Sequence, residues 1–318
     1  MKRKMFIGKN LSDTLKQELS RELPDWAISF KEKDSLQTEK LQEADVIAAW
    51  KPEMEEEIGK GAPLSWIQTW SAGVDQLPLE RYAGRGWRVT SANGVHARPI
   101  SETIFAMLLG WTRKIAAYVR LQGKKEWHHA GLKEEIHGQT VLLYGMGAIG
   151  TETARLAEAF GMRVIGVRRS GKHADYTEKT VTPEEADAYL EKADVVVNTL
   201  PLTENTKEWF TKARFEKMNE RTFFINIGRG GTVEEKSLVE ALQNGVIAGA
   251  GLDVFDEEPL PENHPFWEME QVILTPHTAG STKYYDERVV RDILIPNVKA
   301  FEKNGELPVN EVDVTNGY

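Results

Sequence analysis

The amino-acid sequence predicts an α/β fold built on mostly parallel, doubly wound sheets. Short apolar runs alternate with segments of helical periodicity, and this alternation is typical of βαβ units. At 318 residues, the chain has the length of about two domains. The apolar runs that we expect to form strands are residues 44–50, 66–70, 87–90, 141–144, 164–167, 194–198, 222–226, 248–253 and 272–275.

Two helical segments frame the second set of strands. A helix with a wide apolar face is expected after Pro99, because Ile104, Met107 and Leu108 recur at intervals of one turn. A last helix is expected around residues 286–303. The pattern alone leaves open whether this last helix returns to the N-terminal domain.

The composition restricts the classes of partner. A net charge of −9 argues against a broad nucleic-acid surface, which needs a basic face. The absence of cysteine excludes disulfides and thiolate metal sites and fits a cytoplasmic protein. No apolar stretch approaches the roughly 18 residues of a membrane span. The basic N-terminal residues precede only a short apolar run, so we expect no secretory signal. We also expect no bound metal.

A glycine-rich turn predicts a dinucleotide site. The sequence Gly145-Met146-Gly147-Ala148-Ile149-Gly150 follows an apolar strand and opens a helical pattern, which is the context that this motif requires. Gly145 permits the tight turn, Gly147 lets the backbone approach a pyrophosphate, and Gly150 lets the helix pack on the strand. The helix N-terminus offers free N–H groups to phosphate. A plain tight turn between strand and helix is the alternative interpretation.

The next strand end bears on the choice of cofactor. An NAD site expects an acidic residue about 20 residues after the glycine turn, where it bonds the ribose 2′-hydroxyl. This chain has Arg168, Arg169, Ser170 and Lys172 there. Guanidinium groups bind a 2′-phosphate through charge-assisted hydrogen bonds. NADP(H) is therefore the favoured cofactor, and NAD(H) is the alternative. A solvated basic turn that binds no ligand is the other interpretation of these residues.

Three further segments lie at the carboxyl ends of predicted strands. They are residues 226–230, 252–259 and 274–280. Ligand chemistry in open α/β sheets lies at the carboxyl ends of strands. An arginine, acidic residues and a histidine in these places suggest a carboxylate clamp and an oriented general acid. With the glycine turn and Ser71-Ala72-Gly73-Val74-Asp75, the segments resemble the D-isomer-specific 2-hydroxyacid dehydrogenases. That family includes phosphoglycerate, glyoxylate/hydroxypyruvate and D-lactate dehydrogenases, and the resemblance extends to Pro308-Val309-Asn310.

The resemblance implies a catalytic role for three residues. Arg229 would pair with the substrate carboxylate and hold the keto oxygen, and His277 would donate a proton to that oxygen. Glu258 would hydrogen-bond His277 and keep it protonated. Only the family pattern selects Glu258 over its neighbour Glu257. The histidines that we expect to be structural or on the surface are His96, His128, His129, His137, His173 and His264.

The resemblance also implies the groups that bind the ligands. Backbone N–H groups of Gly73 and Val74 would bind the substrate carboxylate, and Asp253 would hold the nicotinamide carboxamide. The remaining residues expected to line the cofactor are Leu200, Pro201, Leu202, Ile227, Gly228, Ala279 and Gly280.

The fold implied by the resemblance consists of two Rossmann/flavodoxin-like domains with a cleft between them. Residues 1–99 and about 285–318 would form a discontinuous substrate domain, and residues from about 100 to 284 the dinucleotide domain. A homodimer would form through the long helix from Ser101 and the segment around Trp127. Packing of both segments on their own domain is the alternative.

The implied reaction interconverts a 2-keto acid and a D-2-hydroxy acid by hydride transfer. An NADPH-preferring reductase of substrates like glyoxylate or hydroxypyruvate is the main hypothesis. An NAD-linked 3-phosphoglycerate dehydrogenase is the first alternative, but a phosphorylated substrate needs additional cations, and the sequence singles out none. A non-catalytic dinucleotide sensor resembling a corepressor is the second alternative.

Overall fold

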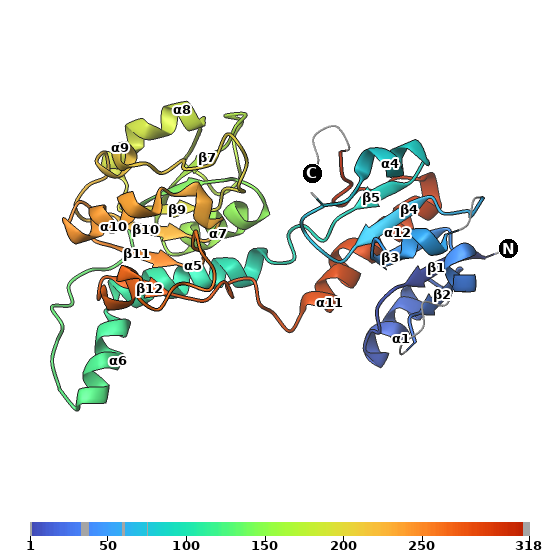
Figure 1. Cartoon of the computed structure of the whole chain (residues 1–318), viewed down its shortest axis with the longest axis horizontal. Helices are drawn as coiled ribbons and strands as arrows, with labels where there is room; N and C mark the ends of the chain where they lie inside the picture. The colour runs from blue at the N-terminus through green and yellow to red at the C-terminus, as the bar shows by residue number, and fades with distance from the viewer. Residues whose placement is uncertain (1, 33–37, 59–60, 75, 314–318) are drawn as a thin grey trace. The chain divides into compact units, whose positions relative to one another are not determined.

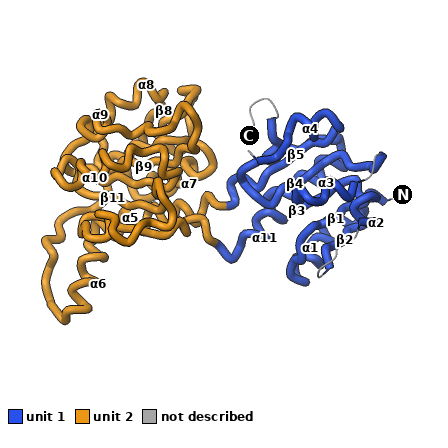
Figure 2. The backbone as a smooth tube through the Cα atoms, viewed as in Figure 1, with its two compact units in different colours: residues 1–95, 282–318 blue, residues 96–281 orange. Residues whose placement is uncertain are grey.

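The chain folds into two compact units with parallel sheets, and each is described separately. A computed structural model describes residues 2–32, 38–58, 61–74 and 76–313, so Asp75 of the predicted substrate motif lies outside the described residues. Unit 1 comprises residues 1–95 and 282–318, and unit 2 comprises residues 96–281 (Figure 2). The predicted α/β class with two parallel-sheet domains is confirmed. Over the described ranges, no helix is both long and apolar enough to cross a membrane.

Unit 1 contains a five-stranded parallel sheet with the order β2-β1-β3-β4-β5 (Figure 1). The chain winds outward in both directions from β1 and β3, so the topological switch point lies between these two strands. The strands are β1 (Arg3–Ile7), β2 (Trp26–Phe30), β3 (Val46–Trp50), β4 (Trp66–Thr69) and β5 (Arg88–Thr90).

Helices cover both faces of the unit 1 sheet. Leu15, Leu19 and the C-terminal residues Leu294 and Val298 pack on one face, so the last helix of the chain belongs to this unit. Leu41, Met54, Leu79 and Tyr82 pack on the other face. The helices are α1 (Asp13–Glu22), α2 (Thr38–Gln42), α3 (Met54–Glu57), α4 (Leu79–Gly84), α11 (Tyr285–Arg288), a π-helical stretch (Val289–Leu294) and α12 (Ile295–Asn304).

Unit 2 contains a seven-stranded parallel sheet with the order β12-β11-β10-β9-β6-β7-β8 (Figure 1). Its switch point lies between β6 and β9, and the glycine turn follows β6. The strands are β6 (Thr140–Tyr144), β7 (Arg163–Val167), β8 (Lys179–Val181), β9 (Val195–Asn198), β10 (Phe223–Asn226), β11 (Gly249–Leu252) and β12 (Val272–Leu274).

Successive residues of the central strands enter two different cores, as expected for strands buried on both faces. Val141 and Leu143 of β6 face α5 and α7, whereas Leu142 and Tyr144 face the other helical layer. The helices are α5 (Ala97–Thr112), α6 (Ile115–Lys124), α7 (Ala148–Ala159), α8 (Pro183–Ala186), α9 (Lys212–Phe215), α10 (Glu235–Gln243) and the 3₁₀ turns Asp187–Lys192, Gly230–Thr232 and Pro265–Glu268.

Helix α6 stands away from the rest of unit 2. It follows α5 after Lys114, whose φ of +59° breaks the helix, and none of its residues is buried. Figure 1 shows α6 and the segment after it extending from the sheet layers of this unit. Helix α5, in contrast, buries Ile104, Phe105 and Met107 within its own unit.

Candidate functional site

The glycine turn is closed on its protein side and open on its outer side. Gly145 has a φ of +97°, and a Cβ there would lie 2.5 Å from Oγ1 of Thr199. A Cβ on Gly150 would overlap the carbonyl oxygen of Gly145, so the helix and the turn touch without a side chain between them. Gly147 has open space in the direction of its missing Cβ. A ligand can therefore approach the backbone at Gly147.

The N-terminus of α7 has the properties of a phosphate site. Gly147 is its N-cap and supplies no capping side chain, and the first turn contains no acidic residue. The N–H groups of Ala148 and Ile149 are therefore not capped by a side chain, at the positive end of the helix dipole. Met146 is buried beneath the turn, where it packs against Gly166 of the neighbouring strand.

The basic turn adjoins the glycine turn. The N–H of Gly145 donates to the carbonyl of Val167 at 3.1 Å, which joins the glycine turn to the end of β7. Arg168, Arg169 and Ser170 follow immediately, and the N–H of Gly171 donates to Arg168 at 3.0 Å to close the turn. This strand end carries two guanidinium groups and no carboxylate, as the sequence shows.

A buried polar network shapes the loops after β9 and β10. The amide nitrogen of Asn198 donates to Oδ1 of Asn226 at 3.0 Å and to the hydroxyl of Thr232 at 2.7 Å. Oδ1 of Asn198 accepts from the N–H of Leu200, and Oδ1 of Asn226 accepts from the N–H of Gly228. The two asparagines therefore fix the backbone that precedes Arg229. Sequence reasoning assigned them no role, although each ends an apolar strand.

Asp253 organises the loop that carries His277. Its side chain is buried, and Oδ1 accepts from the hydroxyl of Thr275 at 2.6 Å and from the N–H groups of Thr278 and Ala279 at 2.9 and 3.2 Å. Its carbonyl accepts from the N–H of His277 at 2.9 Å. One residue at the end of β11 thus holds most of the loop after β12.

His277 and Glu258 form a hydrogen-bonded pair at the same edge of the sheet. Nδ1 of His277 lies 2.7 Å from Oε2 of Glu258, and the other carboxylate oxygen accepts from the N–H of Phe255 at 3.0 Å. The side chain of His277 is 51% exposed, so Nε2 can reach a ligand. The backbone of His277 has a φ of +52°, an uncommon conformation for a residue with a side chain.

The charge of Glu258 is stabilised by its neighbours. Burial would raise the pKa of this carboxyl, but the hydrogen bonds from His277 and Phe255 and the charges of His277 and Arg229 outweigh burial. The pKa of Glu258 therefore lies below its ordinary value.

Arg229 belongs to the same group of charges. Nη1 of its guanidinium donates to the carbonyl of Gly228 at 2.8 Å, and its own carbonyl accepts from the hydroxyl of Thr232 at 2.6 Å. A Cβ on Gly230 would overlap the carbonyl of Phe255, so the loop of Arg229 lies directly against the segment that leads to Glu258. The structure thus brings together the three residues for which a catalytic role is predicted.

The residues predicted to line the cofactor differ in exposure. Leu200 is half-buried, Pro201 is exposed and Leu202 is 49% exposed, so this segment can offer apolar surface to a ligand. The buried members of the predicted lining are Ile227, Gly228 and Ala279, and Gly280 is half-buried.

Gly73 and Val74 lie in unit 1, in the loop after β4. The carbonyl of Gly73 accepts from the hydroxyl of Ser71 at 2.8 Å, and the carbonyl of Val74 accepts from the N–H of Leu77 at 2.9 Å. Among the described residues, neither N–H of the pair has an acceptor. Two adjacent free donors are suited to an anionic oxygen.

Two of the other histidines hydrogen-bond to groups other than Glu258, and the rest are exposed. Nδ1 of His96 lies 2.8 Å from the carbonyl of Gly280, and Nε2 of His264 lies 3.1 Å from Oε1 of Glu235. The exposed ones are His128, His129, His137 and His173. In the part of the chain that the structure describes, no three His, Asp or Glu side chains are arranged to hold a metal ion.

Comparison with known proteins gives concordant matches. The family model described as D-isomer specific 2-hydroxyacid dehydrogenase, NAD binding domain, matches residues 105–279. The chain is 31% identical to the glyoxylate reductase of Korarchaeum cryptofilum, over 98% of this chain and 96% of the relative. A crystal structure of a family protein from Aeromonas salmonicida is 30% identical with a TM-score of 0.79, covering 99% of this chain and 100% of that one.

A second solved structure contains a ligand of the predicted kind. It is the NADPH-dependent glyoxylate/hydroxypyruvate reductase of Sinorhizobium meliloti in complex with NADP and sulfate. That protein is 30% identical to this chain with a TM-score of 0.77, and the alignment covers 100% of both chains.

Proposed function

We propose that this chain, which belongs to the D-isomer-specific 2-hydroxyacid dehydrogenase family, is an NADPH-preferring reductase of small 2-keto acids such as glyoxylate and hydroxypyruvate. Membership of the family makes it an NAD(P)-dependent D-2-hydroxyacid dehydrogenase. The observation that carries the proposal is the His277–Glu258 pair beside the charge of Arg229. The pair supplies a proton and the arginine supplies a positive charge, and reduction of a 2-keto acid needs both.

The residues of unit 2 fit a nicotinamide dinucleotide. Gly147 leaves room for a pyrophosphate at the start of α7, and the overlap that a Cβ at Gly150 would cause accounts for the glycine there. We assign the 2′-phosphate to Arg168 and Arg169, and the nicotinamide carboxamide to Asp253. When bound, the reduced dinucleotide supplies the hydride that adds to the carbonyl carbon of the substrate.

The protein supplies the proton and the orientation. His277 donates a proton from Nε2 to the carbonyl oxygen, because Nδ1 is held by Glu258. Arg229 binds the substrate carboxylate and the carbonyl oxygen, a task for which its forked donors are suited. We also assign the free N–H groups of Gly73 and Val74 in unit 1 to substrate binding. In this proposal, unit 1 is the substrate domain and unit 2 the dinucleotide domain.

A panel of 2-keto acids tests the proposed reaction. Oxidation of NADPH and of NADH is followed with glyoxylate, hydroxypyruvate, pyruvate and longer 2-keto acids. We expect turnover of glyoxylate or hydroxypyruvate, with kcat/KM higher for NADPH. Turnover with NADH alone would contradict the cofactor assignment. Binding of the dinucleotide without turnover of any acid would favour a sensor over an enzyme.

Replacing the two arginines is expected to weaken selection of NADPH. In Arg168→Asp/Arg169→Ala, the 2′-phosphate loses charge-assisted hydrogen bonds worth about 1.5–3 kcal/mol each, so kcat/KM for NADPH should fall at least about 100-fold. The value for NADH should stay the same or rise. Arg163→Ala is the matched control, because Arg163 is an exposed arginine at the opposite end of β7. Equal losses for both cofactors would indicate a folding defect and not loss of a phosphate site.

We also propose a homodimer formed through helix α6 and the segment after it. Ile115 and Val119 are 52% and 60% exposed, and Trp127 is fully exposed. A ten-residue helix with no buried residue is marginal on its own, and such apolar exposure is typical of an interface. We expect sedimentation to give twice the chain mass, and Val119→Glu/Trp127→Glu to give one chain mass. Lys124→Glu, on the same helix, should remain dimeric. A wild-type monomer at micromolar concentration would refute the proposal.

A further inference from the structure

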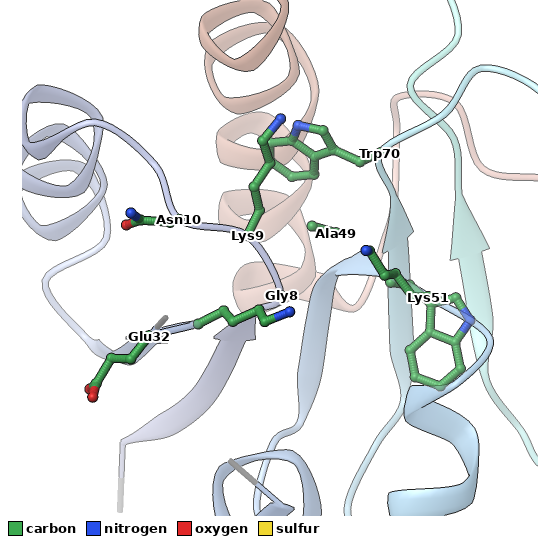
Figure 3. A pocket seen from close by; sticks show the side chains of 9 residues that line it. Gly8, Lys9, Asn10, Glu32, Ala49, Lys51 and Trp70 are labelled. Carbon is green, nitrogen blue, oxygen red and sulfur yellow. The ribbon is translucent and has the colours of Figure 1, made fainter. Parts of the chain in front are cut away.

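The pocket at the carboxyl edge of the unit 1 sheet belongs to the proposed substrate domain. Lys9 and Trp70 line it, and both side chains bind Oδ1 of Asp286. Figure 3 shows Lys9 and Trp70 together in this pocket. Trp70 lies in the same loop after β4 as Gly73, so the pocket is part of the site already described. A different set of contacts, in unit 2, has no role in the proposed mechanism.

Unit 2 contains a second pair of a histidine and a glutamate. Nε2 of His264 lies 3.1 Å from Oε1 of Glu235. The two side chains are 15% and 21% exposed, so the pair is largely shielded from water. Glu235 is the first residue of α10, where the positive end of the helix dipole stabilises a carboxylate.

The hydrogen bonds of His264 fix the position of its ring proton. Nδ1 accepts from the N–H of Phe266 at 3.3 Å, so this nitrogen carries no proton. The proton is therefore on Nε2, which donates to Glu235. The two nitrogens thus have separate tasks, because Nδ1 caps the 3₁₀ turn Pro265–Glu268 and Nε2 holds the glutamate.

Glu235 in turn holds the backbone next to Glu258. Its other carboxylate oxygen, Oε2, accepts from the N–H of Asp256 at 3.2 Å. The N–H of the preceding residue, Phe255, donates to Glu258 at 3.0 Å. Two consecutive N–H groups are therefore bound by two glutamates, one of which is the hydrogen-bond partner of His277.

The segment that carries these N–H groups is packed closely. A Cβ on Gly230 would overlap the carbonyl of Phe255, so the loop after β10 touches the segment directly. The ring centroids of Phe255 and Phe266 are 6.4 Å apart, and those of Phe266 and His264 are 4.5 Å apart. The segment therefore contacts both the loop after β10 and the turn that His264 caps.

We propose that Glu235 and His264 are positioning residues for Glu258. Their hydrogen bonds fix the backbone from Phe255 onward, and the carboxylate of Glu258 thereby stays within hydrogen-bond distance of His277. This inference rests on the proposed function, in which His277 is the proton donor. A catalytic group that is displaced by about 1 Å can lose about 100-fold in rate, so a distant anchor of this kind has a measurable effect.

Two replacements of His264 separate the anchor from the turn cap. His264→Asn keeps an acceptor in the place of Nδ1 and loses the donor to Glu235, whereas His264→Gln keeps a donor to Glu235 and loses the cap. We expect His264→Asn to lower kcat about 10- to 100-fold with little change in KM, and His264→Gln to keep most of the wild-type kcat. The reverse order would overturn the proposal, because it would show that only the cap matters.

A double-mutant cycle tests whether Glu235 acts through Glu258. Glu235→Gln should lower kcat in the wild-type background, because one amide cannot accept both hydrogen bonds. In the Glu258→Gln background, the same replacement should change kcat by less than about twofold. An equal loss in both backgrounds would indicate a general folding defect and would contradict the proposal.

The charge of Glu235 needs a separate control. Burial, followed by the charges of Glu235 and Glu208, raises the pKa of Asp256. Replacing Glu235 therefore also changes the electrostatics of Asp256. Glu208→Gln removes the other charge and leaves the anchor in place, so it should keep the wild-type kcat. A loss equal to that of Glu235→Gln would attribute the effect to charge and overturn the proposal.

A spectroscopic measurement distinguishes this inference from the proposed function. In protein labelled with ¹⁵N in its histidine rings, the Nδ1 proton of His277 should give a downfield resonance that His277→Ala lacks. This resonance should shift or broaden in His264→Asn and remain in His264→Gln. If the wild type reduces no 2-keto acid, the proposed function fails, while the resonance still tests the anchor. A resonance that is unchanged in His264→Asn and in Glu235→Gln would overturn the inference.

Discussion

Replacing His277 with alanine is expected to lower kcat about 100- to 10,000-fold, the usual contribution of a positioned general acid. The imidazole is held through Nδ1 by Glu258. NADPH consumption at saturating substrate measures the loss, and the dissociation constant for NADPH should change little. The loss should be in the proton-donating step and not in binding of the dinucleotide.

A histidine from the opposite edge of the sheet provides the control for this variant. His137 is exposed and precedes β6, so His137→Ala should retain wild-type kcat. Circular dichroism and melting temperature should match the wild type in both variants. Near-normal turnover by His277→Ala would refute the proposed mechanism.

Replacing Arg229 should affect the keto acid and not the dinucleotide. Arg229→Ala removes oriented donors next to the reacting oxygen, and kcat/KM should fall about 100- to 1,000-fold. Arg229→Lys keeps the charge but loses the forked geometry, so we expect an intermediate loss carried mainly by KM. Steady-state kinetics with the substrate that the panel identifies measure both variants.

The matched control for Arg229 lies at the other end of the same strand. Arg221 is exposed and precedes β10, so Arg221→Ala should leave both kinetic constants unchanged. If Arg229→Lys were fully active, simple charge would suffice and the bidentate role would be wrong.

The central strands could be predicted because burial on both faces leaves a continuous apolar signal. Val195–Asn198 and Phe223–Asn226 are strands of this kind. Three strands were not predicted. β1 begins with two charged residues, β2 is half-exposed along much of its length, and β8 has only three residues at the sheet edge. The strands β2 and β8 lie at sheet edges, where they are covered less completely and carry weak patterns, whereas β1 is central and its apolar run is only three residues long.

The candidate site could be predicted in part. Gly145, Arg229 and His277 lie in short local motifs, and such motifs can be read along the chain. The asparagine network after β9 and β10 depends on which strands become neighbours. That order is set by tertiary packing, so residues far apart in sequence give no joint signal. Helix α6 was not predicted, because the left-handed backbone at Lys114 that separates it from α5 leaves no mark on the apolar pattern of the sequence.

The buried carboxylate of Asp253 has a consequence for the thermodynamics of ligand binding. Its hydrogen bonds to the loop after β12 form when the chain folds, before any ligand arrives. The conformational entropy of that loop is then already lost in the free protein, so binding need not order it. Ordering on binding would cost about 0.5–1.5 kcal/mol for each mobile side chain. A change at Asp253 would therefore weaken ligand affinity in two ways: the proposed contact with the nicotinamide carboxamide is lost, and binding must then order the loop.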